Sequence, residues 1–282
     1  MRRGGLAWLA VLALLLGGAG ATERPQRVVS LNLTADHWLL ELAAPEQIAA
    51  LTFLAHDPIY CPRWEAARRH AVVRGTAEEV LRLRPDLVIA GRWGATQTVA
   101  MLRRLGVRVE VMEAPEDFAG VAAQARQVGA WLGQVDAAED YVASLERRLA
   151  RVRAARPARP VQVLEYSQNG WVHGADSAFT RLVEEAGGRN LAVERGVGWI
   201  GRVSLEQLVR WKPEALVVPV SVSGSPSVGD ELLRHPAFAR VVHRATAIEL
   251  PEGTADFGGP YTIEGLEVLA AGMRAASGRR LE

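Results

Sequence analysis

Residues 78–89 read Glu-Glu-Val-Leu-Arg-Leu-Arg-Pro-Asp-Leu-Val-Ile, and residues 206–217 read Glu-Gln-Leu-Val-Arg-Trp-Lys-Pro-Glu-Ala-Leu-Val. The two stretches correspond position by position without a gap. Each has the pattern of a short helix, a turn that contains proline and a buried strand. They lie much further apart than the period of any solenoid repeat. The sequence therefore predicts two similar α/β lobes and not an array of stacked repeats.

On both sides of these stretches, β-branched runs alternate with helical patterns, which indicates βαβ units and parallel sheets. We predict strands over residues 27–31, 48–51, 86–90, 107–111, 161–166, 215–220 and 245–250. We predict helices over residues 35–42, 77–83, 96–105, 179–186, 205–211 and 262–276, and Thr34 is a candidate N-cap of the first. Residues 52–71 look irregular.

A single long helix is predicted between the lobes, over residues 136–156. Asp136 followed by Glu139 has the pattern of a capping box, and Pro157 stops the helix. One face is apolar, with Tyr141, Leu145, Leu149 and Val152 at helical spacing. The opposite face is predicted to be solvated and carries Glu146, Arg147, Arg148, Arg151 and Arg153. The predicted fold class is thus α/β, with two Rossmann-like lobes (22–135 and 157–282) joined by one helix.

The N-terminus has the pattern of a secretory signal peptide. Two arginines precede an apolar run from Leu6 to Leu16, and small residues lead to Ala21, after which we predict cleavage. The run is too short for a membrane span, which needs about 20 residues. The next residue is Thr22, whereas a lipid anchor requires cysteine there. We expect an exported protein without a lipid anchor.

The composition excludes several classes of protein. A formal net charge of +1 gives no basic surplus for nucleic acid. The single cysteine, Cys61, excludes a disulfide framework and is expected to be shielded within the fold. The six histidines show no paired spacing for a metal site, and we predict no resident cofactor. Eight tryptophans are an excess, and four of them fall in predicted loops and not on amphipathic helices.

The chain resembles the periplasmic substrate-binding proteins of ABC importers for iron–siderophores, heme and cobalamin. The segments that carry the resemblance are 27–31, 83–90, 186–190 and 203–208, in that order, together with the long helix and the signal peptide. The resemblance covers about residues 26 to 278. It implies two lobes on a stiff connecting helix, a ligand in the cleft between them, limited closure and no catalysis.

The resemblance also implies a membrane partner, namely the ABC permease and ATPase complex of the inner membrane. Each lobe of such proteins presents a glutamate, seven residues before the proline of the repeat, to arginines of the permease. Those positions are Glu78 and Glu206 here. Both fall in the first turn of a predicted helix, where the helix dipole favours an acid. The neighbouring Glu79 is expected to be exposed and without a role.

The ligand cleft is expected at the loops that follow the carboxyl ends of the strands. Aromatic side chains there favour a flat or bulky ligand such as a metal chelate, and arginines there would neutralise an anionic one. The candidate ligand-binding residues are Tyr60, Trp64, Arg92, Trp93, Tyr166, Trp171, Trp199, Arg202, Phe257 and Tyr261. Trp38, Trp131 and Trp211 lie in helical patterns and are expected in the core.

The identity of the ligand stays open at this point. A ferric siderophore and cobalamin are the first candidates, although Gly91 stands where cobalamin binders of this family tend to have an aromatic residue. Heme is the alternative, for which Tyr60, His56, Tyr166 and His173 are candidate axial ligands. A different class, a secreted α/β hydrolytic enzyme using His56 with Asp57, is a second alternative. Residues 196–201 match G-x-G-x-x-G, but no predicted strand precedes them, so a dinucleotide site is not expected.

Overall fold

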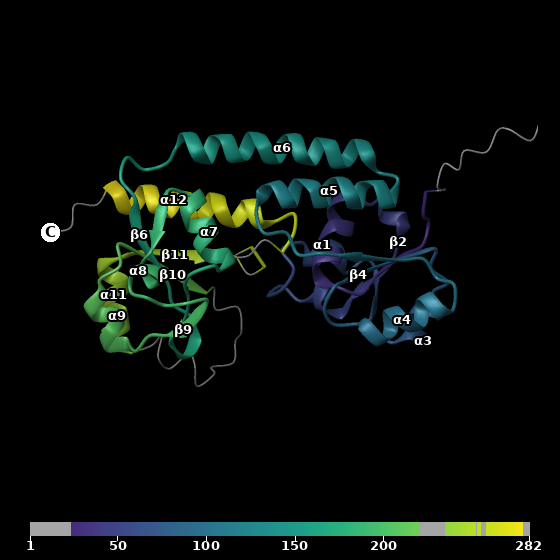
Figure 1. Ribbon diagram of the computed structural model, residues 1–282, viewed down its shortest axis with the longest axis horizontal. Coiled ribbons are helices and arrows are strands. Elements are labelled where there is room, and N and C mark those ends of the chain that lie inside the picture. The colour runs from purple at the N-terminus through teal and green to yellow at the C-terminus, as the bar shows by residue number, and fades with distance from the viewer. Residues whose placement is uncertain (1–23, 220–234, 252, 255–257, 279–282) are drawn as a thin grey trace, which may run out of the picture.

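The computed structural model describes residues 24–219, 235–251, 253–254 and 258–278, which form two α/β lobes (Figure 1). The first lobe has a parallel sheet in the order β3-β2-β1-β4-β5. Its strands are β1 (Val28–Ser30), β2 (Ile48–Thr52), β3 (Ala71–Val73), β4 (Leu87–Gly91) and β5 (Val109–Met112). The α/β fold class predicted from the sequence is confirmed.

The second lobe has a parallel sheet in the order β11-β10-β6-β8 and a separate antiparallel pair, β7 with β9. Its strands are β6 (Val161–Glu165), β7 (Trp171–His173), β8 (Gly188–Asn190), β9 (Ile200–Arg202), β10 (Ala215–Pro219) and β11 (Thr246–Leu250). In each sheet the order of the strands reverses beside the first strand of that lobe. The reversal lies between β1 and β4 in the first lobe and between β6 and β10 in the second. Such a switch point is where α/β sheets bind ligands.

Helices cover both sheets. The α-helices are α1 (Leu33–Leu42), α2 (Trp64–Ala67), α3 (Ala77–Arg82), α4 (Thr96–Arg104), α5 (Phe118–Leu132), α6 (Val135–Ala154), α7 (Ala178–Glu185), α8 (Leu191–Glu194), α9 (Leu205–Trp211), α11 (Pro236–Arg244) and α12 (Thr262–Gly278). Short 3-10 turns are η2 (Pro45–Gln47), η3 (Phe53–His56) and η4 (Gln168–Gly170).

The internal repeat of the sequence is also a repeat of structure, α3–β4 in one lobe and α9–β10 in the other. In both copies a left-handed residue links the helix to the proline, Arg84 with φ 47° and Lys212 with φ 52°. A residue before proline avoids the right-handed helical region, so the helix ends there. Both β4 and β10 lie at the switch point of their sheet.

Helix α6 runs along one side of both lobes (Figure 1). The predicted apolar face is buried, including Leu145, Leu149 and Val152. The predicted capping box is wrong, because Gln134 is the N-cap and makes no side-chain capping bond. Glu139 instead forms an ion pair with Arg126 of α5, with Nε 2.8 Å from the carboxylate.

The opposite face of α6 is exposed as predicted at Glu146, Arg147, Arg151 and Arg153, whereas Arg148 is partly buried. Arg148 forms an ion pair with Glu267 of α12 at 2.7 Å, and Arg153 forms one with Glu185 of α7 at 2.6 Å. Helices α5 and α6 approach so closely that a Cβ at Gly129 would overlap that of Ala138. The glycine is therefore required by the packing of the two helices.

The chain between β11 and α12 returns to the first lobe. Tyr141 of α6 donates a hydrogen bond to the carbonyl of Pro260 at 2.9 Å, and the ring of Tyr261 lies 5.1 Å from that of His37. Arg63 of the first lobe pairs with Glu264 of α12 at 2.5 Å. Pro260 thus contacts the connecting helix α6, and Tyr261 contacts the first lobe.

Most elements lie within two residues of their predicted bounds, but several were not predicted. Asn32, and not Thr34, caps α1, its side chain accepting from the Ala35 amide. Residues 52–71 contain two helical turns and the start of β3. The pair β7–β9, strand β8 and helices α5, α8 and α11 were not predicted with bounds. Trp38 is fully buried in the core, as expected, and donates to Gln124 at 2.6 Å.

No helix in the described part of the chain is both long and apolar enough to cross a membrane. The predicted signal peptide, residues 1–21, lies outside the described residues.

Candidate functional site

The loop after β4 presents an exposed arginine–tryptophan pair at the switch point of the first sheet. Trp93 is 79% exposed, and the Arg92 guanidinium lies 5.5 Å from the centre of its ring. Both Glu113 carboxylate oxygens accept from Arg92, at 2.9 and 3.0 Å. The charge of Arg92 is therefore balanced by a neighbour of opposite sign.

The loop after β2 presents two further aromatic candidates. Tyr60 is 44% exposed, and its backbone carbonyl, 3.2 Å from His37 Nε2, ties the loop to α1. Trp64 is half-buried at the start of α2, with the Arg68 guanidinium 5.6 Å from its ring. This loop thus offers one exposed ring, that of Tyr60, and one half-buried ring, that of Trp64.

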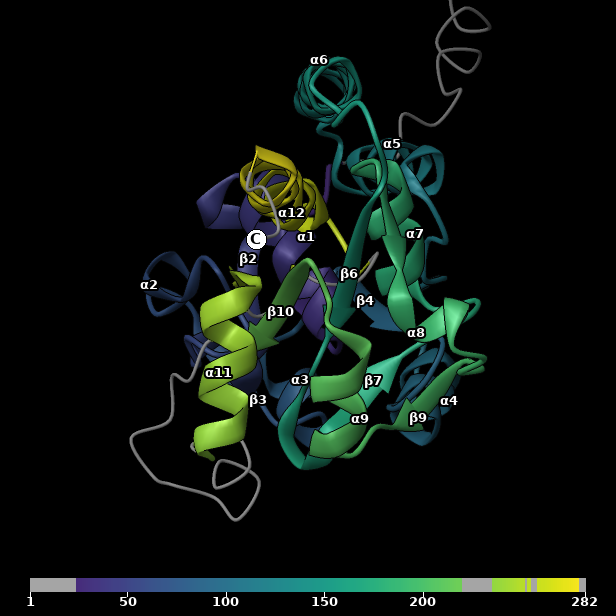
Figure 2. The ribbon, with the colours of Figure 1, turned by 90° about the vertical axis from the view of Figure 1, so that its left-hand side faces the viewer.

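In the second lobe, β7 and β9 form a two-stranded ribbon that follows β6 (Figure 2). Trp171 pairs with Arg202 and His173 pairs with Ile200. Side chains of directly opposed residues, and of residues two apart on one strand, share a face. Trp171, His173, Ile200 and Arg202 therefore form one face of the ribbon, which we call the ribbon face. Val172, on the other face, is buried.

The ribbon face carries a second arginine–tryptophan pair. The Arg202 guanidinium lies 5.4 Å from the Trp171 ring, and its Nε and Nη2 donate to the carbonyl of Asn169 at 3.2 and 3.0 Å. Unlike Arg92, Arg202 is held by a neutral carbonyl and makes no ion pair with the described residues. Trp199, just before β9, is 67% exposed.

Two predicted ligand residues lie in the interior instead. Tyr166 is fully buried and donates to the carbonyl of Val203 at 3.1 Å, and burial raises its pKa. Tyr261 is 2% exposed, between His37 and the Arg63 guanidinium, which lies 4.6 Å from its ring. In this structure both rings join elements together and offer no surface to a ligand. Phe257 lies outside the described residues.

The candidate docking acids lie in the first turns of α3 and α9, and both are exposed. Figures 1 and 2 show these two helices on the side of the molecule opposite α6. Glu79, which we expected to have no role, has a structural one. It completes a capping box with Thr76 and accepts from the Arg74 amide at 2.9 Å, so it stabilises the helix that presents Glu78.

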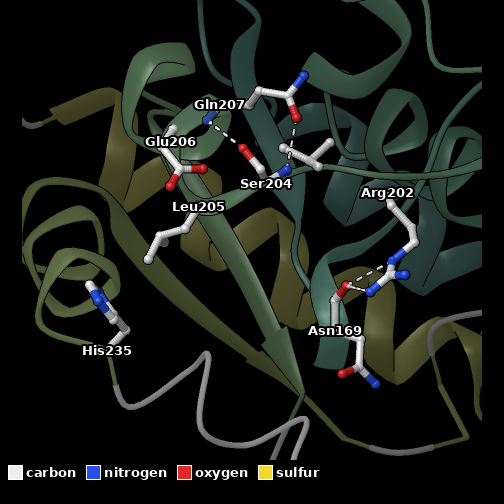
Figure 3. A pocket seen from close by; sticks show the side chains of 8 residues that line it. Asn169, Arg202, Ser204, Leu205, Glu206, Gln207 and His235 are labelled. Atoms are coloured by element: carbon white, nitrogen blue, oxygen red, sulfur yellow. Dashed lines mark hydrogen bonds between the residues drawn. The ribbon is translucent and has the colours of Figure 1, made fainter.

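Glu206 borders a cavity of about 620 Å³ whose lining includes Asn169, Arg202 and His235 (Figure 3). A hydrogen bond with the Ser204 side chain is the main cause that lowers the pKa of Glu206, and the charge of His235 acts in the same direction. Ser204 and Gln207 form the capping box of α9. Glu206 therefore stays ionised beside the ribbon face.

The four axial-ligand candidates differ in their surroundings. The Tyr166 hydroxyl is engaged in the interior, as described above. His56 Nε2 lies 3.0 Å from the carbonyl of Ala67. His173 Nδ1 lies 2.5 Å from Glu165, the last residue of β6. The sequence analysis missed Glu165, for which the only signal is its place at the end of a predicted strand.

The structure gives no support to a hydrolytic site at His56 and Asp57. One ring nitrogen of His56 is bonded to the backbone, and Asp57 Oδ1 accepts from the Ile59 amide at 2.8 Å. Cys61 is buried, and burial raises its thiol pKa to about 11, so it is not an activated nucleophile. No cluster of three metal-ligating side chains occurs within the ranges the structure describes.

Comparisons with known proteins agree with this architecture. The model of the family described as periplasmic binding protein matches residues 28–247. A cobalamin-binding protein of Halobacterium salinarum is 28% identical over 236 residues, covering 80% of this chain and 61% of that protein, so the chain spans about three fifths of this relative. A vitamin B12-binding protein of Salmonella typhimurium is 30% identical over 217 residues, covering 70% of this chain and 80% of that protein.

A solved structure shows the same fold. The apo periplasmic heme-binding protein from Roseiflexus is 26% identical, with a TM-score of 0.74 over 89% of this chain and 99% of that one. Proteins of this kind bind solutes and are not enzymes, and they work with the permease and ATPase of an ABC importer. The chain belongs to the periplasmic binding protein family, among the relatives that include cobalamin- and heme-binding proteins.

Proposed function

We propose that this protein is the periplasmic solute-binding component of an ABC importer and that its cargo is a metal chelate, with a cobalamin-like corrinoid as the first candidate. The observation that carries the proposal is the set of exposed rings at the carboxyl edges of the two sheets, Trp93 in one lobe and Trp171 and Trp199 in the other. Exposed tryptophan is costly in water, and a large, partly apolar ligand would cover it. The cobalamin-binding relatives support the corrinoid.

Heme is the second candidate. The solved heme-binding relative supports it, and so does the half-exposed imidazole of His173 on the ribbon face. A ferric siderophore remains the third chelate, since the same rings would contact a catecholate. We propose that the signal peptide predicted at residues 1–21 directs the protein to the periplasm.

Tryptophan fluorescence of the purified protein tests the ligand class. The titrants are aquacobalamin, hemin and a ferric catecholate siderophore, each with a protein-free absorbance correction. We expect quenching by one of them at stoichiometric ratio, with a smaller response when Trp199 is replaced by phenylalanine and Trp93 by leucine. The absence of any saturable response to all three would refute the proposed ligand class.

Uptake by whole cells tests the docking assignment. Glu78→Lys together with Glu206→Lys should abolish uptake while leaving ligand affinity intact, because both side chains are exposed. Each reversal weakens only a local interaction with a helix dipole at an exposed position, so we expect the variant to stay folded. Asp140→Lys with Glu146→Lys on the outer side of α6 is the matched control with the same change in charge. Equal uptake by the two variants would refute the docking assignment.

A further inference from the structure

His173 on the ribbon face has a carboxylate beside its Nδ1, as metal-binding histidines usually have. Its Nδ1 lies 2.5 Å from a Glu165 carboxylate oxygen, and Glu165 ends β6 at the carboxyl edge of the second sheet. With the proton on Nδ1 and donated to Glu165, the lone pair of Nε2 is free. A carboxylate on the far nitrogen is the usual companion of a metal-bound histidine, since it fixes the tautomer and raises the basicity of the ligating nitrogen.

The backbone around His173 is fixed as well. Asn190 donates to the carbonyl of His173 at 2.8 Å, and the strand pairs with Ile200 across the ribbon. The side chain is 40% exposed, and Nε2 makes no hydrogen bond with the described residues. The free nitrogen therefore projects from a rigid two-stranded ribbon and not from a loose loop.

The neighbours on the ribbon face suit a flat metal complex with an anionic group. Trp171 and Ile200 supply apolar surface, 43% and 41% exposed. Arg202, diagonal to His173 across the ribbon, donates to a neutral carbonyl and makes no ion pair with the described residues. Such diagonal neighbours have Cβ atoms roughly 7–8 Å apart, so one ligand can reach both.

His37, His56 and Tyr166 lack this arrangement. His37 is buried and lies 3.2 Å from the carbonyl of Tyr60. His56 is bonded to the carbonyl of Ala67, and the hydroxyl of Tyr166 is engaged inside the lobe. Tyr60 is 44% exposed, and its hydroxyl makes no hydrogen bond with a carboxylate among the described residues.

We propose that His173 Nε2 coordinates the metal of the cargo, an inference that rests on the proposed function. The cargo is then a metal macrocycle with an exchangeable axial position and not a coordinatively saturated siderophore. The nitrogen lone pair replaces an axial water of the macrocycle, the water leaves, and the Nδ1 proton stays in the hydrogen bond to Glu165. A corrinoid and a ferric porphyrin share this chemistry, and the experiment separates them.

Visible absorption of the purified protein with paired probes tests this. Aquacobalamin and hemin each have an exchangeable axial position, whereas dicyanocobinamide and metal-free protoporphyrin IX are their counterparts without one. We expect one of the two open probes to show a nitrogen-ligand band shift on binding. His173→Ala should abolish this shift and weaken that probe at least tenfold, and leave its blocked counterpart within twofold. Glu165→Gln should weaken the open probe about 10-fold while keeping the shift.

His243→Ala, an exposed histidine on α11, is the control and should behave as wild type. If His173→Ala binds the open probe with the wild-type spectrum, His173 is not the ligand and the proposed function still stands. Equal weakening of open and blocked probes would assign His173 a packing role and overturn the inference. If the wild-type protein binds none of these probes but binds a ferric siderophore, the macrocycle is excluded and this inference falls. Binding of no chelate at all overturns the proposed function itself.

Discussion

Arg63 joins the two lobes through contacts that a single substitution removes. Its guanidinium lies 2.5 Å from Glu264 of α12 and 4.6 Å from the centre of the Tyr261 ring. The Arg63 side chain is 44% exposed and that of Glu264 is 29% exposed. A largely solvated ion pair contributes about 0.2–1 kcal/mol and a cation–π contact at such a site about 0.5–1 kcal/mol. Arg63→Met keeps the apolar stem, and we expect it to lower the free energy of unfolding by about 1–2 kcal/mol.

The loss should depend on pH with a defined sign. Burial raises the pKa of Glu41, and the positive charge of Arg63 lowers it, so Arg63 favours the ionised form of Glu41. The stabilisation that Arg63 provides through Glu41 is therefore present where Glu41 is ionised and is lost as pH falls through the pKa of Glu41. The variant should be further below wild type at pH 8 than at pH 4.

Urea unfolding followed by circular dichroism measures the change. Arg126→Met is the matched control, because Arg126 pairs with Glu139 between α5 and α6, both about half exposed, without an aromatic partner. We expect the control to lose less stability than Arg63→Met, because a solvated ion pair contributes little. A double-mutant cycle of Arg63→Met with Glu264→Gln should give a coupling of about 0.2–1 kcal/mol. An Arg63 variant as stable as the control, with zero coupling, would refute the interlobe role.

Three further outcomes follow from burial and protonation. Trp199→Ala should weaken cargo binding at least tenfold, measured by titration, and should change the free energy of unfolding by no more than about 0.5 kcal/mol, measured by thermal melting. Trp38→Ala should lower the free energy of unfolding by about 3–5 kcal/mol, because that ring is buried. Cys61 should resist a thiol reagent in the native protein and react once guanidinium unfolds it, since it is buried with a raised pKa. Glu165 raises the pKa of His173, so the pair should stabilise the fold at low pH and should lose this effect as pH rises through the raised pKa. The urea midpoint of Glu165→Gln should lack this dependence on pH.

Most elements were predictable because their signals are local. The helix–proline–strand stretches show their apolar spacing and their stop residue within a dozen positions, and the structure keeps both copies, with left-handed Arg84 and Lys212 at equivalent places. The buried face of α6 was predicted from spacing for the same reason. Glu139 was misassigned because its partner Arg126 lies on another helix, and short-range patterns carry no information about that contact.

The candidate site was less predictable, since the orientation of a loop side chain depends on distant contacts. Tyr166 and Trp171 follow the same strand, yet the hydroxyl of Tyr166 reaches the carbonyl of Val203 and is buried, whereas Trp171 stays 43% exposed. Strands β7 and β9 have three residues each, too few to show a period, so their pairing was not predicted. That pairing is what places Arg202 over Trp171.

The repeated unit explains how cargo and permease can be recognised at one edge of each lobe. In a parallel α/β sheet the connecting helix runs opposite to the strands, so its first turn lies at the edge where the strands end. The Thr98 hydroxyl, near the start of α4, donates to the carbonyl of Gly75, just before α3, at 2.8 Å, which joins the loop after β4 to the turn that presents Glu78. In the second lobe Arg202 and Glu206 line one cavity. The proposed cargo residues and the proposed docking acids thus share one edge of each sheet, so under the proposed function a bound ligand would lie close to the docking surface without a large closure of the lobes.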